Sequence, residues 1–165
     1  MYKVLFACTA NVCRSPMAEA ILKNLIKKEN LEKFFKVDSF AVWGGDGFSP
    51  SNLSQKVMQE HGLDISSHLS QSISPKILNS GDLILCMTPQ HKSDLLHVFP
   101  HFENKIFTLT EFGRKLPPKK NAIDDPIGMN LNFYRRIYRE IEHEILRIYP
   151  IIKRKAGIQQ TTSDS

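Results

Sequence analysis

The stretch YKVLFACTANVCRSP, residues 2–16, decides the fold of this chain. Residues 2–7 are mostly apolar and β-prone, whereas the residues that follow them are small or polar. From Ser15 onward apolar residues recur at helical spacing, and we expect Ser15 to cap this helix with Pro16 at its first position. The stretch therefore predicts a strand that leads through a short loop into a helix N-terminus, an arrangement that binds anions.

Strands and helices alternate along the rest of the chain. The segment GDLILCM, residues 81–87, carries a continuous apolar run, which is typical of a central strand in a parallel sheet. The alternation predicts a single α/β domain with a parallel sheet, whose ligands bind beyond the carboxyl ends of the strands. The other expected strands cover residues 37–43 and 105–109, and the expected helices cover residues 51–61, 88–96 and 130–149.

The last of these helices should close the domain. Residues 130–149 carry one apolar stripe, which indicates a face packed on the core. Residues 150–165 end in QQTTSDS and hold too little apolar content to fold alone. We therefore expect one domain over residues 1–149 and a mobile C-terminal tail over residues 150–165.

Composition is that of an ordinary globular protein, because 41% of the 165 residues are hydrophobic and 24% are charged. The net charge of +5 suits acidic or phosphorylated partners. The basic residues are dispersed and not interleaved with aromatic ones, so we expect no nucleic-acid partner. No apolar run suits a signal peptide or a membrane span. Since the three cysteines form no disulfide pattern, we expect a cytoplasmic protein that does not bind membranes.

The loop after the first strand joins a thiol, an arginine and a hydroxyl, at Cys8, Arg14 and Ser15. Loop N–H groups at a helix N-terminus bind phosphate, and the planar fork of Arg14 can hold two of its oxygens. Thiols in such electropositive surroundings ionise readily, so we expect Cys8, aided by the Ser15 hydroxyl, to attack phosphorus and form a phosphocysteine. The residues expected to bind the substrate phosphate are Thr9, Ala10, Asn11, Val12, Cys13 and Ser15.

A proton for the leaving group must come from another part of the chain. The segment Asp124-Asp125-Pro126 precedes the final helix, in a loop that can reach the site. We expect Asp125 to act first as general acid and then as general base. No set of Cys and His residues completes a metal site around the loop, so we expect neither a metal nor an organic cofactor.

Other residues near these motifs leave alternatives open. Asn11 tolerates the left-handed backbone that a tight phosphate loop requires, while Ala10 fits only with a negative φ. His61 and His68 either contact the loop or are ordinary surface or core histidines. Trp43 either lines the cleft or packs in the core.

The motif C-x5-R-S-P after the first strand, with D-P near the C-terminus, resembles the low-molecular-weight protein tyrosine phosphatases. The segments HGLDISSH at 61–68 and GDLILCMTPQHK at 81–92 also resemble segments of that family, so the likeness covers most of residues 1–149. The resemblance implies a four-stranded parallel sheet with helices on both faces and a phosphate-binding loop after the first strand.

The same resemblance implies roles for individual residues. The nucleophile, the phosphate-binding arginine and the general acid fall on Cys8, Arg14 and Asp125. Cys13 falls on a second thiol, which under peroxide can form a reversible disulfide with Cys8 and protect it from overoxidation. A plain loop cysteine explains Cys13 equally well.

The resemblance leaves two substrates open. Tyrosine-specific members usually carry aromatic residues after D-P, where this chain has Ile127 and Gly128. The D-P-x-G pattern and M-T-x-x-H at 87–91 instead resemble the bacterial protein arginine phosphatases of the same fold, which usually have threonine in place of Val12. Valine lacks the hydroxyl that would orient a guanidinium N–H. We therefore predict a protein tyrosine phosphatase that releases inorganic phosphate from phosphotyrosine in proteins, with phosphoarginine as the alternative.

Two further alternatives rank lower. An arsenate reductase of this family uses a relay of thiols, but Cys86 lies in a predicted strand rather than in a loop. A phosphate-binding module without turnover would need neither a thiolate nor a distant acid.

Overall fold

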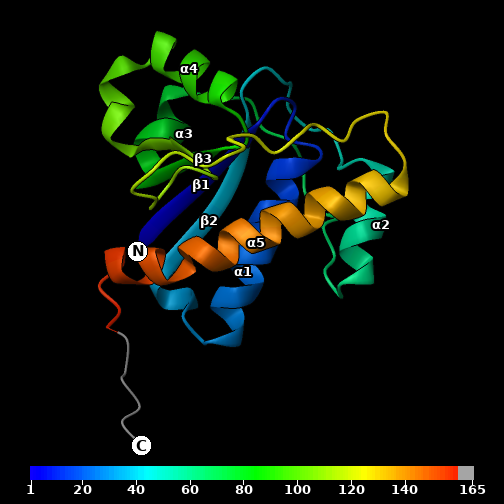
Figure 1. Ribbon diagram of the computed structural model, residues 1–165, viewed down its shortest axis with the longest axis horizontal. Coiled ribbons are helices and arrows are strands. Elements are labelled where there is room, and N and C mark those ends of the chain that lie inside the picture. The colour runs from blue at the N-terminus through cyan, green and yellow to red at the C-terminus, as the bar shows by residue number, and fades with distance from the viewer. Residues whose placement is uncertain (160–165) are drawn as a thin grey trace, which may run out of the picture.

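Strand β1 (Tyr2–Cys8) lies in the middle of a parallel sheet with helices on both sides of it (Figure 1). The structure is a computed structural model, and the residues that it describes are 1–159. The sheet has four strands in the order β2-β1-β3-β4, and all neighbouring strands are parallel. The predicted α/β fold with a four-stranded parallel sheet is therefore confirmed. The other strands are β2 (Phe35–Ala41), β3 (Leu83–Cys86) and β4 (Ile106–Thr108).

The helices form two layers. Helices α1 (Arg14–Lys28), α2 (Asn52–Glu60) and α5 (Leu131–Lys155) contribute to one apolar core, and helices α3 (Pro75–Ser80) and α4 (Pro89–Val98) contribute to a second on the opposite face. Short 3-10 helices, η1 (Glu32–Phe34) and η2 (Pro100–Lys105), precede β2 and β4. The two cores explain why the central strands are apolar on both faces, because neither face of β1 or β3 meets water.

Strand β1 shows this directly. Val4 and Phe6 belong to the core beneath α1 and α5, while Leu5 and Ala7 belong to the core beneath α3 and α4. All four side chains are completely buried. Since successive side chains of a strand point to opposite faces, a strand buried on both faces must be apolar at every position. This burial fixes the end of β1, and with it the start of the loop that follows.

The start of α1 differs from the prediction. The helix begins at Arg14, and no side chain caps it. Ser15 was expected as the cap, but its hydroxyl lies 3.0 Å from the Cys8 sulfur and accepts a hydrogen bond from the Asn11 side chain. The cap prediction was wrong because the backbone N–H groups at this end of the helix belong to the anion loop, while the hydroxyl serves the thiol.

Helix α3 is an element that the sequence analysis did not identify. It spans only six residues, too few to show a helical apolar period. Its start does carry a signal, since the Ser74 side chain accepts a hydrogen bond from the Ile77 N–H and Pro75 occupies the first turn.

Helix α5 is longer than predicted. It continues through Pro150 to Lys155, so the first six residues of the expected tail are helical. Ile152 extends the apolar stripe by one turn beyond Ile148 and is completely buried. A proline inside a helix costs about 3 kcal/mol, and burial of this extra turn offsets that cost. The prediction was wrong for residues 150–155, and residues 160–165 lie outside the described residues.

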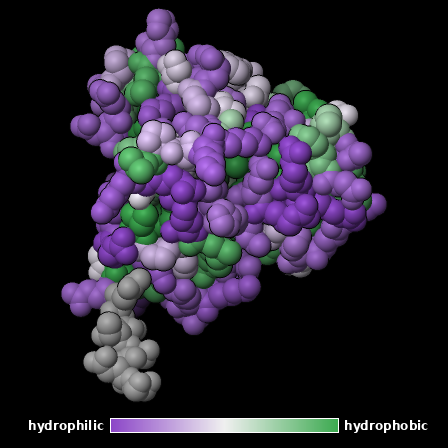
Figure 2. All heavy atoms as spheres, in the orientation of Figure 1, coloured by the Kyte–Doolittle hydropathy of each residue, from purple (hydrophilic) through white to green (hydrophobic). Residues whose placement is uncertain are grey.

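The outer surface over α5 is polar. Figure 2 shows the face that α5 crosses in Figure 1 as largely hydrophilic, with small apolar patches. Within residues 1–159, no helix combines the length and the apolar character that crossing a membrane requires.

Ile152 tests whether the last turns of α5 belong to the folded domain. We expect Ile152→Ala to lower the free energy of unfolding by about 2–4 kcal/mol, because it removes a completely buried side chain and leaves a cavity. Leu146→Ala is the control, since Leu146 lies on the same helix with 50% of its surface exposed. Urea denaturation of both variants measures the difference, and equal, small losses would mean that the helix end contributes no stability.

Candidate active site

The loop between β1 and α1 is held in shape by Asn11. Its backbone has φ of 59°, in the left-handed region, and its side chain is completely buried. That side chain donates to Ser15 Oγ at 2.7 Å and to Ser39 Oγ at 2.8 Å, and accepts from the Gln71 N–H at 3.1 Å. Asparagine is one of the few residues that accepts this backbone, as the sequence analysis predicted for this position. Ala10 is not among the described residues with positive φ, so alanine fits there without strain.

The turn after β2 approaches the loop closely. A Cβ atom on Gly44 would lie 2.9 Å from the Ala10 Cα atom, closer than real Cβ contacts. The Val42 and Trp43 N–H groups donate to the Cys8 and Thr9 carbonyls at 2.9 and 3.0 Å. These contacts turn the loop carbonyls outward, away from its concave side. The N–H groups of the loop are then available to an anion.

Cys8 lies at the end of β1, and its side chain is buried beside a small cavity. The cavity has a volume of about 170 Å³ and lies beside the loop. The Ser15 hydroxyl, 3.0 Å from the sulfur, is placed to donate to a Cys8 thiolate. The lining residues are Cys8, Thr9, Ala10, Val12, Cys13, Arg14, Asp125 and Ile127. Most of the predicted phosphate-binding segment therefore surrounds one cavity, while Asn11 and Ser15 support it from behind.

Arg14 is a buried cation in the wall of this cavity, with only 3% of its surface exposed. Its Nη1 donates to the Ile123 carbonyl at 2.7 Å, and its Nη2 donates to Thr9 Oγ1 at 3.3 Å. Nε has no hydrogen-bond partner within residues 1–159. A buried guanidinium with an unpaired N–H favours an oxyanion in the adjacent cavity, because the oxyanion supplies both the missing acceptor and the opposite charge.

The two neighbouring aspartates differ sharply in their surroundings. Asp125 Oδ2 lies 3.6 Å from Arg14 Nη2 and lines the cavity, and its carboxylate also accepts from the Ile127 N–H at 3.1 Å. Asp124 instead pairs with Lys120 at 2.8 Å and with Arg136 at 3.2 Å. The hydrogen bond from Lys120 holds the pKa of Asp124 below its usual value. Asp125 is therefore the carboxyl in position to exchange a proton with a group bound in the cavity.

His91 connects helix α4 to the loop and was not predicted as a site residue. Its Nε2 lies 2.9 Å from Thr9 Oγ1, and its Nδ1 lies 3.0 Å from Thr88 Oγ1, which also caps α4. Burial, reinforced by the positive charge of Arg14, lowers the pKa of His91 to about 4. The imidazole is therefore neutral at neutral pH, and it holds Thr9 by a hydrogen bond without adding a charge. The M-T-x-x-H pattern at 87–91 contains this histidine, but in the sequence it indicated only a substrate class.

Cys13 is buried under the loop, where three helices meet. Its sulfur lies 3.5 Å from the Tyr134 hydroxyl and 3.4 Å from Ser51 Oγ. Burial raises the pKa of Tyr134 to about 12, so the phenol is a neutral hydrogen-bonding group. Cys13 thus links the start of α1 to α5 and to the cap of α2.

The remaining candidate residues differ in whether they lie at the site. His68 Nε2 lies 3.2 Å from the Asn11 carbonyl, so this histidine contacts the loop, whereas His61 stacks on Tyr138 with ring centroids 3.8 Å apart. Trp43 is 56% exposed and tilts over His91, so it belongs to the surroundings of the site and not to the core. Cys86 is completely buried in β3, as predicted, and burial raises the pKa of its thiol.

No group of three His, Cys, Asp or Glu side chains able to hold a metal occurs in the part of the chain that the structure describes. The chemistry of the cavity is that of a thiol, a guanidinium, backbone amides and a carboxyl. Such a set can bind a tetrahedral oxyanion, attack it and supply a proton.

Comparison with known proteins agrees with this geometry. The family described as low molecular weight phosphotyrosine protein phosphatase matches residues 3–158. A protein-arginine-phosphatase of Bacillus subtilis (strain 168) is 32% identical over 145 residues, which are 87% of this chain and 91% of that protein. The low molecular weight phosphotyrosine protein phosphatase of Homo sapiens is 31% identical over 138 residues, covering 83% and 87%. The crystal structure of a low molecular weight protein tyrosine phosphatase from T. tengcongensis superposes with a TM-score of 0.83 at 34% identity, covering 92% of this chain and 99% of that chain.

The different pairing of the two aspartates gives a direct test of the acid. We expect Asp125→Asn to lower kcat for phenyl phosphate by about 10²- to 10⁴-fold, because phenolate is a poor leaving group that needs a proton. The loss should be much smaller for p-nitrophenyl phosphate. Asp124→Asn is the matched control. Because it removes ion pairs that anchor the segment but not the acid itself, we expect a smaller loss of kcat that is the same for both substrates. Equal losses in the two variants, or a loss in Asp125→Asn that is the same for both substrates, would contradict the assignment.

His91 should make stability depend on pH. Its pKa is near 6.5 in the unfolded chain and about 4 in the folded protein, so between these values the unfolded state binds more protons. Stability is therefore complete above pH 6.5 and falls as the pH falls toward 4. After a discount for solvent screening, the loss from pH 7 to pH 5 should exceed that of His91→Gln by about 1–2 kcal/mol. Urea denaturation at both pH values measures this, and an identical loss in both proteins would show that His91 titrates normally.

Proposed function

The chain belongs to the low molecular weight phosphotyrosine protein phosphatase family, and from that premise we propose that it hydrolyses phosphotyrosine in proteins through a phosphocysteine on Cys8. The observation that carries this proposal is the joint placement of Cys8, Arg14 and Asp125 around one small cavity. In the proposed reaction Cys8 bonds to phosphorus, Arg14 binds the phosphoryl oxygens and Asp125 exchanges the proton.

In the first step, the Cys8 thiolate attacks phosphorus while the loop N–H groups and Arg14 bind the three non-bridging oxygens. The sulfur–phosphorus bond forms, the bond from phosphorus to the phenolic oxygen breaks, and Asp125 donates its proton to that oxygen. Charge on the transferring group meets donors that are already in place, so the protein does not have to reorganise during the reaction. The Ser15 hydroxyl stabilises the thiolate before attack.

In the second step, Asp125 is a carboxylate and takes a proton from a water molecule that attacks phosphorus. The sulfur–phosphorus bond breaks, Cys8 leaves as a thiolate and inorganic phosphate is released. Residues of the chain supply the nucleophile of the first step, and in both steps they stabilise charge and transfer the proton, so the proposed mechanism includes no metal and no organic cofactor.

The mouth of the cavity supports phosphotyrosine as the substrate. Val12 and Ile127 line it with apolar side chains, and Trp43 is exposed nearby on the ring of His91. A phenyl ring can pack on such a surface without losing hydrogen bonds. The guanidinium of phosphoarginine carries N–H donors that Val12 cannot accept, and buried unpaired donors are costly.

Phosphoarginine is the second candidate substrate, because of a residue at the rim of the cavity and because of the proteins that are similar to this chain. The residue after Ile127 is Gly128, with φ of 77°, so the acid loop presents no aromatic side chain there. Protein-arginine-phosphatases are among the similar proteins, at 32% and 33% identity. Both substrates would follow the same two steps on Cys8. A thiol relay of the arsenate reductase kind is less well supported, because Cys86 is completely buried in β3.

We also propose phosphorylated proteins as partners, the cytoplasm as the compartment and Cys13 as a redox partner of Cys8. Both thiols are free and buried at the same loop. A disulfide between them would remove the nucleophile reversibly until a thiol reductant restores it.

Val12 provides the test of substrate class. We expect the wild-type protein to show a higher kcat/KM for a phosphotyrosine peptide than for a phosphoarginine peptide. Val12→Thr adds a hydroxyl at constant size, and it should narrow or reverse that ratio. Cys8→Ser is the control for the mechanism, and it should bind phosphate but release none from either peptide. A wild-type preference for phosphoarginine would establish the second candidate.

A further inference from the structure

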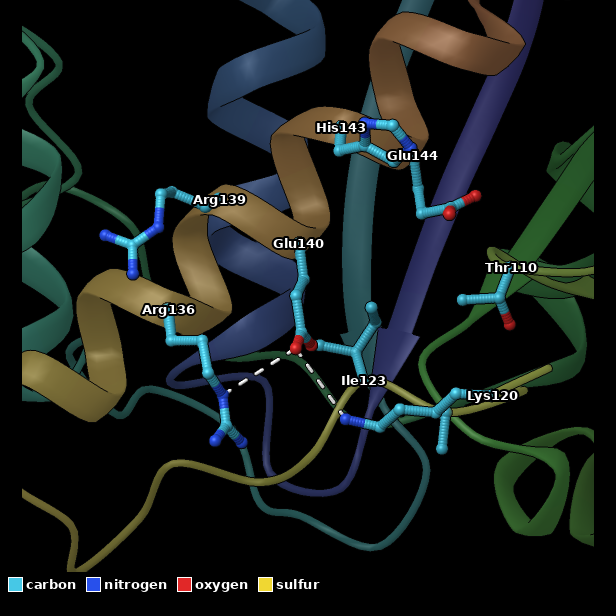
Figure 3. Close-up of a pocket in the computed structure, with 9 residues that line it drawn as sticks. Thr110, Lys120, Ile123, Arg136, Arg139, Glu140, His143 and Glu144 are labelled. Carbon is cyan, nitrogen blue, oxygen red and sulfur yellow. Dashed lines mark ion pairs between the residues drawn. The ribbon is translucent and has the colours of Figure 1, made fainter. Parts of the chain in front are cut away.

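A larger cavity lies between α5 and the chain around Ile123 (Figure 3). Its volume is about 490 Å³, compared with about 170 Å³ for the cavity at Cys8. Cavities of this size are typical of small-molecule sites. One wall is the outer side of α5, and the opposite wall is the chain from residue 120 to residue 123. The lining residues are Thr110, Lys120, Ala122, Ile123, Arg136, Arg139, Glu140, His143 and Glu144.

The cavity has a surplus of positive charge. Lys120, Arg136 and Arg139 line it, against the carboxylates of Glu140 and Glu144. Glu144 is already neutralised by Arg114 and Arg147, which approach from outside the cavity at 3.1 and 2.7 Å. Within residues 1–159, Arg139 makes no ion pair or side-chain hydrogen bond. Arg139 is an exposed cation at the edge of the cavity, so it is free to pair with an anion that binds there.

Glu140 is held loosely at the centre of the cavity. Figure 3 shows its side chain extending from α5 toward Ile123, between Lys120 and Arg136. One carboxylate oxygen lies 3.7 Å from Lys120 and 3.6 Å from Arg136, too far for hydrogen bonds. The other oxygen has no hydrogen-bond partner in the described chain. Both cations can therefore turn away from Glu140 without losing a hydrogen bond to it, and the contacts that a ligand must replace are those with Asp124.

The rest of the lining combines the polar residues Thr110 and His143 with an apolar wall. Ala122 and Ile123 form the wall opposite α5, and the aliphatic stems of the arginines add to it. We propose that this cavity binds a small organic oxyanion with an apolar body, and that its occupation changes phosphatase turnover. Arg139 and Lys120 or Arg136 would hold the oxyanion, and the alanine and isoleucine would contact the apolar body. Neither role belongs to the catalytic cavity.

Three contacts connect this cavity to the catalytic one. The Ile123 carbonyl accepts a hydrogen bond from Arg14 at 2.7 Å, so a residue that lines the larger cavity contacts the arginine that lines the catalytic one. Lys120 and Arg136 hold Asp124, the residue next to the proposed acid. An oxyanion that takes up Lys120 and Arg136 competes directly with Asp124. Asp124 then loses its ion pairs with Lys120 and with Arg136 on α5, so the neighbouring Asp125 shifts, while the Ile123 N–H stays bonded to the Met87 carbonyl at 2.8 Å.

This coupling predicts a specific kinetic pattern. A ligand in the larger cavity should lower kcat at saturating substrate, because it acts on the position of Asp125 and not on access to Cys8. Linkage makes this coupling reciprocal. If a ligand in the larger cavity changes the affinity of the catalytic loop for an oxyanion, the oxyanion changes the affinity of the larger cavity for that ligand by the same factor.

The test uses benzoate and isophthalate, aromatic probes with one and two carboxylates, on the full chain. The catalytic loop is first filled with stoichiometric vanadate, and each probe is then titrated while the backbone amide resonances are followed. We expect saturable shifts at residues 120–124 and 136–144. Arg139→Gln should weaken binding about tenfold or more, since it removes one charge-assisted hydrogen bond. Arg154→Gln is the matched control, because it makes the same charge change on the same helix outside the cavity.

Turnover of phenyl phosphate, whose poor leaving group depends on the acid, completes the test. Wild-type protein and Arg154→Gln should lose kcat as the probe is added, while Arg139→Gln should have normal basal kcat and lose the response. Shifts confined to residues 8–15, purely competitive inhibition that is equal in all three proteins, or no shift with either probe at millimolar concentration would overturn the proposal. None of these outcomes depends on whether phosphotyrosine or phosphoarginine is the substrate.

Discussion

Arg14 is a cation that the fold buries almost completely, and a buried charge is tolerated only where acceptors surround it. Its fixed acceptors come from both ends of the sequence: Thr9 in the first loop and the carbonyl of Ile123 in the segment before α5. Because of this requirement, Arg14 and Ile123 contact each other although they lie 109 positions apart in the sequence. Because Asp125 follows Ile123 by two residues, the bond that satisfies the arginine also sets where the acid lies.

A second constraint acts on the other side of the loop. Asn11 accepts a left-handed backbone and uses its side chain to join α1, β2 and the segment at Gln71. The loop therefore keeps its shape without a bound anion, and its amides are oriented in advance. Preorganised donors stabilise developing charge because nothing has to move when it appears. The rigidity of the loop contrasts with the acid segment, whose side-chain anchors are surface ion pairs.

The sheet and the loop could be predicted from the sequence because their signals are local. The apolar run of β1, the small residues after it and the C-x5-R spacing all lie within one stretch of the chain. The errors come from contacts between distant residues. Ser15 resembles a helix cap in sequence, and only the position of Cys8 shows that it serves the thiol. His91 contacts the loop through Thr9, which lies 82 positions away in the sequence, and a local sequence pattern cannot show such a contact. Pro150 suggests a helix end, but the core that buries Ile152 overrides it.

The loop and the rim of the catalytic cavity recognise different parts of a substrate. Membership of the family therefore does not establish which leaving group the protein accepts. In the proposed complex, the loop amides, Arg14 and Cys8 contact only the phosphoryl group, which is the same in phosphotyrosine and phosphoarginine. The leaving group would meet Val12, Ile127 and the exposed Trp43, where a substitution alters the fit without disturbing the fold. Relatives of both kinds can therefore match this chain equally well over the same residues. The choice between them depends on a few side chains at the mouth, and chiefly on whether Val12 leaves a guanidinium donor unpaired.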